Sequence, residues 1–449
     1  MLFTNKKLLV ALLLTFMGQI GFAQALGLLD AYEAALQHDP IYRAAIHENE
    51  AGQQEATIGR AGLLPNLSIT HVQSRNTGTQ IFSATNTTPR TESPLNFNSN
   101  VSTLSLRQPL LNMEAVASYR QGHARANSSR ARFTGNSQLL VVRLFEAYVE
   151  SLLAQDRFNL AKTQRDALEE LMRVNNHMLQ KGEGTTTDVL ETQSRFSLAQ
   201  AQIIEANDEM EIAQLRLEAI VGQEIKQLNR LSDTFQIHAI QLPDYDSWQA
   251  LALERNAELA TQRHTVMSEQ QEINRSHAGH APRVDLVASL SRNKAASFIV
   301  QNRDARFASI GVEVNIPIYS GGRVNAITRQ ARANHARAEA DLDAIKDGVL
   351  VEIRTQHRLL QSSTQRIKSL ELAVESAELL VHATQKSIQG GIRSNLDLLD
   401  AQQQLFTTRR DLTEARYNYL LAYLRLQFAA GTLVLDDLQK ISAYFTASN

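Results

Sequence analysis

Apolar and polar residues alternate with a period of two in four short segments of the chain, a pattern typical of β-strands with one apolar face. The clearest segment runs from Val284 to Ser291, where every second residue from Val284 onward is apolar. The other three segments cover residues 67–72, 104–107 and 310–316. Each strand is expected to have about 9–11 residues, the length of a tilted strand that crosses a membrane. The pattern therefore predicts two pairs of strands.

A polar connection separates the two strands of each pair, Asn76–Asn100 in the first and Arg292–Arg306 in the second. Arg107, Asp285 and Glu313 each lie on the strand face opposite the apolar one. This arrangement is expected if one face meets lipid and the other lines a water-filled lumen. The alternative is a pair of soluble hairpins packed on a protein core, and the three charged residues count against it.

Four strands are too few to close a β-barrel, since the smallest closed membrane barrels have about eight. The edges of an open sheet carry unpaired N–H and C=O groups, which lipid cannot satisfy. If these strands span a membrane, several copies of the chain must therefore assemble, and each copy contributes its four strands.

Helical patterns fill most of the remaining chain. Helical stretches at Leu28–Gly62 and Trp248–Gly279 precede the two strand pairs, and proline-free segments at 113–180 and 324–389 follow them. Each proline-free segment makes about 100 Å of helix at 1.5 Å per residue. Within the second segment, apolar residues recur every seven positions at Ile353, Leu360, Ile367, Val374, Val381 and Ile388. Such a repeat predicts a coiled-coil seam. Ordinary bundle packing explains the seam as well but not the length.

The chain repeats its own plan. Asp39–Pro65 recurs 217 residues later as Asn256–Pro282, which indicates two copies of one supersecondary unit. Each long helix is expected to end at a glycine-rich turn, and a return helix starts at a cap, at 185–188 in one copy and 394–395 in the other. The predicted division is a signal peptide (1–25), a first repeat (26–222) with a hairpin at about 66–109, a linker with a small strand at 235–240 (223–246), a second repeat (247–431) with a hairpin at about 283–318, and a tail (432–449).

Composition and net charge reduce the number of function classes that the chain could belong to. The chain has 449 residues, a net charge of −2 and no cysteine. This charge gives no reason to expect nucleic acid as a partner, and the missing cysteine excludes disulfides and cysteine-based zinc sites. Lys6 and Lys7, an apolar run at 8–16 and an A-x-A sequence at 23–25 are typical of a cleaved export signal. A membrane anchor, the alternative, needs about 20 apolar residues. We therefore expect a mature protein beyond the inner membrane.

The export signal, the duplicated plan and the glycine turns together resemble the TolC family of outer-membrane channel-tunnels. The most specific residues are Leu64-Pro65, the run Ile316–Gly322, and the two G-x5-D turns Gly182–Asp188 and Gly391–Asp397. The resemblance covers essentially the whole mature chain. It implies a mainly α fold with membrane β: a homotrimer whose 12-stranded outer-membrane β-barrel continues as an α-helical coiled-coil tunnel into the periplasm.

The resemblance further implies a closed tunnel entrance near the two turns. The candidate gate residues are Asp188, Glu191, Arg393, Asp397 and Asp400, and the candidate adaptor-docking residues are Lys181, Gly182, Gly390 and Gly391. Positions i and i+3 share one helix face, so three copies are expected to direct six carboxylates of Asp397 and Asp400 at one constriction. Arg393 and Asp188 match residues that hold the family's entrance shut. The alternative is that an acidic first helical turn merely suits the helix dipole. It explains Asp188 and Asp397, and the second acids, Glu191 and Asp400, less well.

The chain departs from the family pattern at two places. A tyrosine that helps to lock some members is Ile388 here, and the family's Val-Gly docking turn is Lys181-Gly182 in one copy and Gly390-Gly391 in the other. The run 181–193 is most similar to the type I secretion branch. That similarity implies a passive exit duct for proteins, in the outer membrane of a Gram-negative bacterium, with a periplasmic adaptor, an inner-membrane ABC exporter and outer-membrane lipid as partners. The alternative is the outer-membrane component of a tripartite multidrug efflux pump with a proton-driven pump.

An enzyme is the rival class of protein. The sequence has no G-x-S-x-G elbow, phosphate loop or H-E-x-x-H motif. His277 and His280 are three residues apart but have no acidic partner in register for a metal site. We therefore expect no enzymatic activity, no cofactor and no metal. A purely structural periplasmic coiled coil is a second rival, which would form no oligomer embedded in a membrane.

Overall fold

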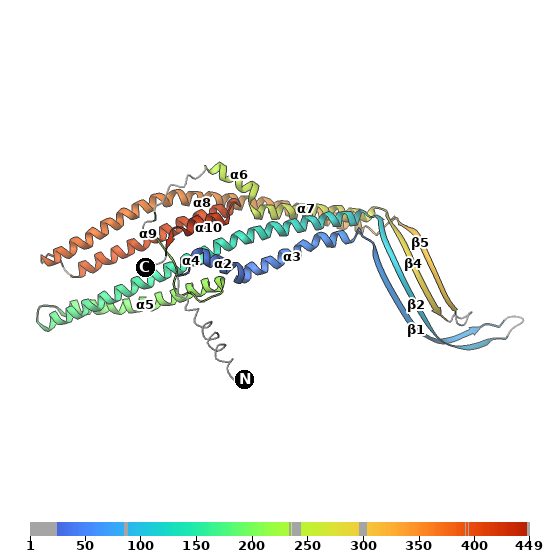
Figure 1. The fold of residues 1–449 in the computed structure, drawn as a ribbon, viewed down its shortest axis with the longest axis horizontal. Helices are drawn as coiled ribbons and strands as arrows, with labels where there is room; N and C mark the ends of the chain where they lie inside the picture. Colours follow the sequence, from blue (N-terminus) through green and yellow to red (C-terminus); the bar gives the residue numbers. More distant parts are fainter. Residues whose placement is uncertain are drawn as a thin grey trace, which may run out of the picture. The chain divides into compact units, whose positions relative to one another are not determined.

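The computed structural model describes residues 25–84, 89–232, 235, 244–295, 303–390, 392–393 and 395–446. Nearly all of the predicted signal peptide, and all of the predicted small strand at 235–240 except residue 235, lie outside these residues. The elements (Figure 1) are α2 (Leu28–His38), α3 (Pro40–Ala61), β1 (Asn66–Phe82), β2 (Thr91–Leu111), α4 (Met113–Gln180), α5 (Thr186–Val221), β3 (Arg230–Leu231), α6 (Tyr245–Arg255), α7 (Ala257–His277), η1 (Ala278–His280), β4 (Arg283–Ala295), β5 (Arg303–Asn315), α8 (Arg323–Gln389), α9 (Asn395–Ala430), α10 (Leu435–Ser442) and β6 (Phe445–Thr446).

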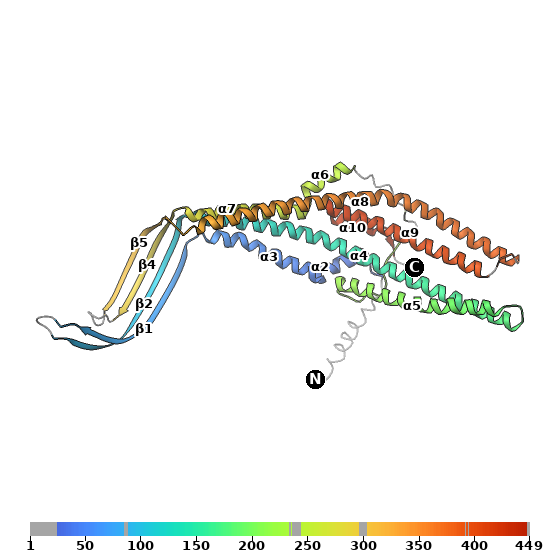
Figure 2. The same ribbon diagram turned by 180° about the vertical axis from the view of Figure 1, so that it is seen from behind.

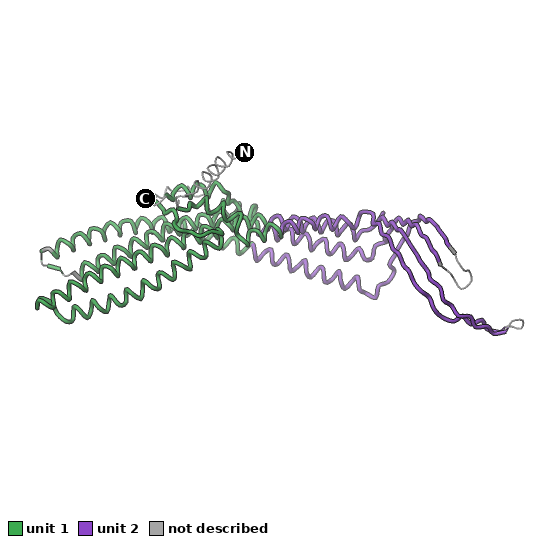
Figure 3. The backbone as a smooth tube through the Cα atoms, turned by 60° about the horizontal axis from the view of Figure 1, so that its bottom comes forward, with its two compact units in different colours: residues 1–47, 133–257, 346–449 green, residues 48–132, 258–345 purple. Residues whose placement is uncertain are grey.

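The chain divides into two compact units (Figure 3). Unit 1 contains residues 1–47, 133–257 and 346–449, and unit 2 contains residues 48–132 and 258–345. Both units take residues from both predicted repeats, so the repeat boundaries stay a prediction. None of the helices in the described part of the chain is long and apolar enough to cross a membrane.

Unit 2 holds a four-stranded antiparallel sheet in the order β1-β2-β4-β5. The two views of the ribbon (Figure 1 and Figure 2) show the strands side by side in this order. The predicted hairpins are confirmed, and the β2–β4 pairing joins one hairpin to the other. Among the residues that the structure describes, β1 and β5 each pair on one side only, so the sheet has two open edges within one chain.

The expected strand length of 9–11 residues is wrong. β1 and β2 have 17 and 21 residues, and β4 and β5 have 13 each. Much of the predicted polar connection Asn76–Asn100 forms regular β1–β2 pairs, such as Thr77 with Asn96. The alternation of apolar and polar residues predicted only the part of each strand in which one face is apolar. Backbone pairing continues beyond that part, where both faces are polar.

The strand register gives the sheet two chemically different faces. Directly paired residues share a face, and the rows Leu67–Leu106 and Ile69–Leu104–Leu290 belong to one face. That face is apolar and unpartnered in one chain: Ile69 and Ile310 are each 77% exposed. This matches the alternation predicted for a lipid-facing surface.

The opposite face carries hydroxyl and charged side chains. One row runs across all four strands as Ser68, Ser105, Ser289 and Ser309. The hydroxyl oxygens of Ser68 and Ser105 are 2.8 Å apart, as are those of Ser289 and Ser309. A polar row of this kind is expected where a sheet faces water.

The three charged residues singled out from the sequence also meet on this polar face. The Arg107 guanidinium lies 2.6 Å from the Asp285 carboxylate and 2.9 Å from that of Glu313. Asp285 is 2% exposed, and Arg283 lies 3.2 Å from the same carboxylate. The prediction that these residues share one face is confirmed, and the structure adds that they form one ion-pair cluster across β2, β4 and β5.

The helical stretches Leu28–Gly62 and Trp248–Gly279 were predicted as continuous and are broken. The first breaks at Asp39 because Pro40 lacks an N–H group and restricts the residue before it. The buried Asp39 carboxylate accepts hydrogen bonds from the N–H groups of Ile41 and Tyr42, at 2.7 and 2.9 Å, and thereby caps α3. Asn256, the repeat counterpart of Asp39, separates α6 from α7.

The long helices agree with the sequence. α4 covers Met113–Gln180, as predicted, and α8 covers Arg323–Gln389 with a start one residue earlier than expected. The predicted seam of α8 faces inward most clearly in its first half, where Ile353, Leu360 and Ile367 are at most 1% exposed. Apolar burial along this seam holds the helix against its neighbours.

Three exposed ion pairs show which helices of unit 1 are neighbours. Arg216 of α5 lies 2.6 Å from Glu150 of α4, and Arg425 of α9 lies 2.6 Å from Glu146 of α4. Arg409 of α9 pairs with Glu378 of α8 at 2.6 Å. α4 is therefore a neighbour of both α5 and α9, and α9 is a neighbour of α8.

An aromatic cluster fixes the middle of α4 against the C-terminal segment. The ring of Tyr148 meets that of Phe445 edge on, with centroids 5.7 Å apart, and Tyr417 stacks on Phe445 at 6.2 Å. The Tyr148 hydroxyl lies 2.9 Å from the carbonyl oxygens of Leu26 and Asn229, and burial raises the pKa of Tyr148. The predicted C-terminal tail is therefore an ordered part of unit 1, through α10 and β6.

Gly431 ends α9 in a left-handed conformation with φ of 70°. A Cβ atom at this position would lie 2.2 Å from the carbonyl oxygen of Arg255. We expect Gly431→Ala to destabilise the protein by more than about 2 kcal/mol, because left-handed strain adds to a clash with backbone. Thermal unfolding followed by circular dichroism measures the effect.

The matched control is Gly348→Ala. Gly348 lies within α8, and a Cβ atom added to it would have no neighbouring atom within 4 Å. This substitution should raise stability by about 0.5–1 kcal/mol. Equal unfolding temperatures for the two variants would contradict the account of Gly431.

Candidate functional site

Two helical turns carry the residues that the sequence singled out. One joins α4 to α5 and the other joins α8 to α9, and both belong to unit 1. Figures 1 and 2 show both turns at the same end of this unit. Lys181, Gly182 and Gly390 lie in these turns, whereas Gly391 is outside the described residues.

The first turn has the hydrogen bonds of a glycine C-cap. Gly182 has φ of 75°, and its N–H donates to the Leu179 carbonyl at 3.0 Å. The N–H of Glu183 donates to the Met178 carbonyl at 2.9 Å. A left-handed residue after the last helical turn is commonly glycine, because other residues are strained there. The turn is thus tightly defined although its side chains are exposed.

The second turn places Ile392 and Arg393 in solvent. The N–H of Ile392 donates to the Ser387 carbonyl at 2.9 Å, and its side chain is 81% exposed. Arg393 is also exposed. Ser394, predicted as the cap of the next helix, lies outside the described residues, and α9 begins at Asn395. Ile388, at the position of the family tyrosine, is half-buried near the end of α8.

Asp188 forms the N-terminal cap of α5 together with Thr185. The Thr185 hydroxyl oxygen accepts from the Asp188 N–H at 3.2 Å, and the Asp188 carboxylate accepts from the Thr185 N–H at 3.2 Å. The Thr185 hydroxyl also donates to this carboxylate at 2.7 Å. This reciprocal pair is a capping box. The local helix-start explanation of Asp188 is therefore correct, although it leaves the carboxylate exposed for further contacts.

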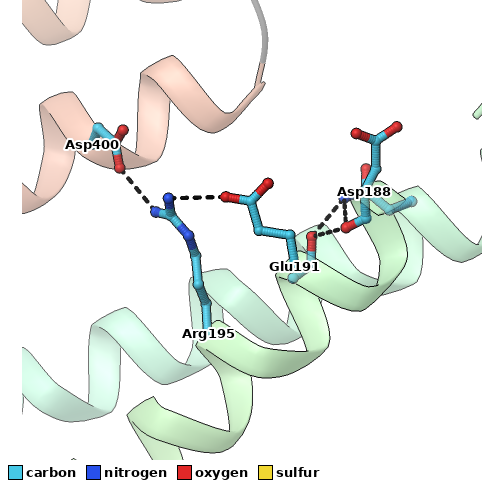
Figure 4. Close-up of polar contacts among 6 residues, drawn as sticks. Asp188, Glu191, Arg195 and Asp400 are labelled. Carbon is cyan, nitrogen blue, oxygen red and sulfur yellow. Dashed lines mark hydrogen bonds and ion pairs between the residues drawn. The ribbon is translucent and has the colours of Figure 1, made fainter. Parts of the chain in front are cut away.

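Arg195 links the two helical hairpins (Figure 4). Its guanidinium on α5 donates to the Asp400 carboxylate on α9 at 3.0 Å and to the Glu191 carboxylate on its own helix at 3.1 Å. The Asp400 contact raises the pKa of Arg195, so the guanidinium stays charged. Two candidate gate residues, Glu191 and Asp400, are thus brought together by a cation that the sequence analysis missed.

A signal for Arg195 was present in the sequence. Glu191 and Arg195 are four residues apart on one helix, a spacing at which opposite charges attract each other. The contact to Asp400 joins residues 205 positions apart, and no local pattern indicates it. The three side chains keep 38–61% of their surface exposed, so each ion pair contributes only about 0.2–1 kcal/mol.

The remaining candidates are Asp397, Arg393 and Asp188. Asp397 lies half-buried in the first turn of α9, three residues before Asp400, and so on the same helix face. Within the described part of one chain, no ion pair connects Arg393 to Asp188.

A cavity of about 830 Å³ lies beside Arg195. It is lined mainly by α4, α5 and α9, and its charged residues include Arg157, Glu209 and Arg410. Leu198 and Phe406 add apolar surface. Arg195 therefore borders a poorly filled region between these helices.

The described residues contain no group of three or more His, Asp or Glu side chains placed to hold a metal ion. The His277 and His280 rings lie edge to face with centroids 5.9 Å apart, and His280 Nε2 is 3.1 Å from the Asn325 side-chain oxygen. Both histidines are thus accounted for as polar residues of unit 2.

Comparison with models of protein families identifies the family to which the chain belongs. The model of the outer membrane efflux protein family matches residues 31–223 and 248–432. These two stretches correspond to the two halves of the chain and together cover most of it. The chain belongs to the outer membrane efflux protein family, a family of Gram-negative outer-membrane channels that extend into the periplasm, and the resemblance stated from its sequence is confirmed.

Two relatives are similar over nearly the whole chain. One is the alkaline protease secretion protein AprF of Pseudomonas aeruginosa, 42% identical, with 95% of this chain and 88% of the relative covered. Another is the proteases secretion protein PrtF of Dickeya chrysanthemi, 39% identical, with 99% of this chain and 96% of the relative covered.

A solved structure supports the fold. The outer membrane channel CmeC of Campylobacter jejuni superposes with a TM-score of 0.78, at 15% identity, and covers 93% of this chain and 89% of its own. The barrel-plus-helical-tunnel fold class predicted from the sequence is therefore confirmed, with four strands and the long helices supplied by one chain.

Proposed function

We propose that this chain is the outer-membrane exit duct of a type I, ABC transporter-driven protein secretion system, and that its cargo is a secreted protease. The observation that carries the proposal is the similarity along nearly the full length to AprF and PrtF, both named for protease secretion. The helical turn at 181–193, where the sequence most resembles the secretion branch, supports the same reading.

The functional unit in this proposal is a homotrimer in outer-membrane lipid. One chain supplies four strands with open edges at β1 and β5, and unpaired backbone groups do not persist in lipid. Pairing of β5 with β1 of the next copy satisfies both edges, and three copies give the 12 strands of the family barrel. The exposed apolar face then meets lipid, and the row of serines that includes Ser105 lines the lumen.

The duct is passive in this proposal. α4 and α8, each about 100 Å long at 1.5 Å per residue, form the tunnel wall with α5 and α9. A periplasmic adaptor and an inner-membrane ABC exporter supply the energy and open the tunnel, and the chain itself performs no enzymatic chemistry. Residues 26–222 and 247–431 are proposed as structural repeats, which the equal lengths of α5 and α9, 36 residues each, support.

The gate is proposed at the turn end of the tunnel, from Asp188, Glu191, Arg393, Asp397 and Asp400 together with Arg195. The contact of Arg195 with Asp400 holds the α4–α5 hairpin to the α8–α9 hairpin in one chain. Asp397, one helical turn before Asp400, adds negative charge at the constriction. Lys181, Gly182, Gly390 and Gly391 are proposed as the surface on which the adaptor docks.

A multidrug efflux duct is the second candidate. The family description, outer membrane efflux protein, favours it because efflux components share this fold. The two functions predict different partners, an ABC exporter in one case and a proton-driven pump in the other. They also predict different losses when the chain is absent.

The trimer is tested with introduced cysteines, since the chain has none of its own. Ser309→Cys on β5 is combined in turn with cysteine at the polar-face positions 66, 68, 70 and 72 of β1. One combination should oxidise to a covalent trimer on a denaturing gel. Ser309→Cys alone is the control, and native mass spectrometry that finds only monomers would contradict the proposed assembly.

The latch, the ion pair of Arg195 with Asp400, is tested in planar bilayers by two variants that break it. Arg195→Ala and Asp400→Ala should both raise the open population, by about 3- to 150-fold if three pairs of about 0.2–1 kcal/mol break together. Their effects on block by divalent cations should be opposite. Arg195→Ala leaves Asp400 without its cation and strengthens block, whereas Asp400→Ala removes a carboxylate and weakens it.

The control for the latch is Arg216→Ala, which breaks an exposed α5–α4 ion pair within one hairpin. Its conductance and cation block should match those of the unchanged protein. If Arg195→Ala behaves like this control, Arg195 has no role in the closed entrance.

The function itself is tested by removing the chain from its host. The proposal expects loss of one or more proteases from the culture medium with unchanged drug susceptibility, measured by mass spectrometry of the medium and by growth inhibition. Restored secretion on re-expression is the control. Raised drug susceptibility with an unchanged set of secreted proteins would favour the efflux alternative.

A further inference from the structure

A cationic row borders the apolar face of the sheet at one sharply defined level. The last apolar row on this face is Ile69–Leu104–Leu290–Ala308. The next row toward the hairpin ends is His71–Ser102–Arg292–Arg306. Side chains on one face recur every second residue, so these two rows are direct neighbours and the chemistry changes from apolar to basic in a single step.

The charges of this region are predominantly positive. Lys294 and Asp304 pair with each other in the row after Arg292, and Asp304 contacts Arg292 at 2.8 Å. Arg306 forms no ion pair with any residue that the structure describes. Three basic side chains, those of Arg292, Lys294 and Arg306, thus surround one carboxylate, that of Asp304. The Arg292 guanidinium binds Asp304, and the neighbouring Arg306 guanidinium provides a second cationic group.

The surface at this boundary is hollowed. A cavity of about 470 Å³ is lined by Ile69, Leu104, Leu290 and Ala308 on its apolar side and by Arg292 and Arg306 on its basic side. The Ser102 hydroxyl, 2.8 Å from His71 Nδ1, lies in the same lining. The site is therefore amphipathic, with an apolar floor and two guanidinium groups along one rim.

We infer that this cavity binds one phosphate-bearing lipid of the outer leaflet, with its acyl chains over the Leu104–Leu290 surface and its phosphate at Arg292 and Arg306. The inference rests on the proposed membrane-spanning trimer, in which the apolar face meets lipid. Guanidinium groups bind phosphate oxygens through paired charge-assisted hydrogen bonds. The apolar floor favours a lipid over a free phosphate ion as the source of the bound phosphate, since a free ion gains nothing from contact with apolar surface.

The Arg292 and Arg306 row marks one edge of the apolar band. Val284 to Leu290 covers six residue steps of β4, about 20 Å along the strand at 3.4 Å per step. At a strand tilt of about 40° this length covers about 15 Å of a lipid-facing band that is about 25 Å tall. Because the Arg292 and Arg306 row directly follows the last apolar row, it falls at the level of headgroups on the side toward which the hairpins extend, away from the helices.

The test uses the full-length protein in nanodiscs of phosphatidylcholine doped with bisphosphorylated lipid A, followed by native mass spectrometry of retained lipid. Lipid A should be retained, and lipid A from which both phosphates have been removed should be retained about tenfold less. Inorganic phosphate at equal concentration should not displace it. Equal retention of the two lipid forms, or displacement by inorganic phosphate, would overturn the inference.

Substitutions of the two arginines test whether they form the lipid site. Arg292→Gln with Arg306→Gln should lower retention of lipid A about tenfold, and the pair of Arg→Lys substitutions should keep part of it, because charge remains but the paired geometry is lost. Arg366→Gln, an exposed arginine on α8, is the control at a site far along the chain and should retain lipid A fully. Full retention by the double glutamine variant would overturn the assignment.

Measurements of trimer formation and secretion separate a failure of this inference from a failure of the proposed function. Cross-linked trimers and protease secretion are measured on the same variants. Trimers that secrete normally but never prefer phosphorylated lipid would overturn the lipid site and leave the secretion duct intact. Absence of trimers in the unchanged protein would instead remove the proposed duct.

Discussion

The open edges of β1 and β5 are the constraint on which the rest of the structure depends. Every backbone N–H and C=O group in a hydrocarbon layer must find a partner within protein. One chain satisfies the interior of its sheet through the β2–β4 pairing but leaves two edges. The proposed assembly of three copies satisfies these edges, and it gives the apolar face lipid to meet and the polar row a lumen to line.

The strand register determines which side chains share each face of the sheet. Because paired residues share a face, a single register places Ser105 in a row of hydroxyls and Leu104 in a row of apolar residues. A slip of one residue would exchange the faces. The Arg107–Asp285 ion pair spans β2 and β4 on the polar face, where it favours the native register, since a slipped strand would leave a buried carboxylate without its cation.

Sequence reasoning predicted what depends on local periodicity and missed what depends on distant contacts. The bounds of α4 followed from the absence of proline between 113 and 180. The break at Asp39 was missed although Pro40 was visible, because the apolar pattern continues across it. The outer parts of β1 and β2 were missed since neither face is apolar there, and only backbone pairing holds them. Arg195 was missed because its partner Asp400 lies 205 residues away.

A closed entrance that partners must open cannot rest on strong contacts. The ion pair of Arg195 with Asp400 is solvent-exposed, so each copy contributes less than about 1 kcal/mol. In the proposed trimer three such pairs act together, which favours the closed state while each contact stays easy to break. Capping of α5 by Asp188 keeps the helix start intact when the pair separates. The hairpins can then move apart as rigid elements, which is what an opening driven from outside requires.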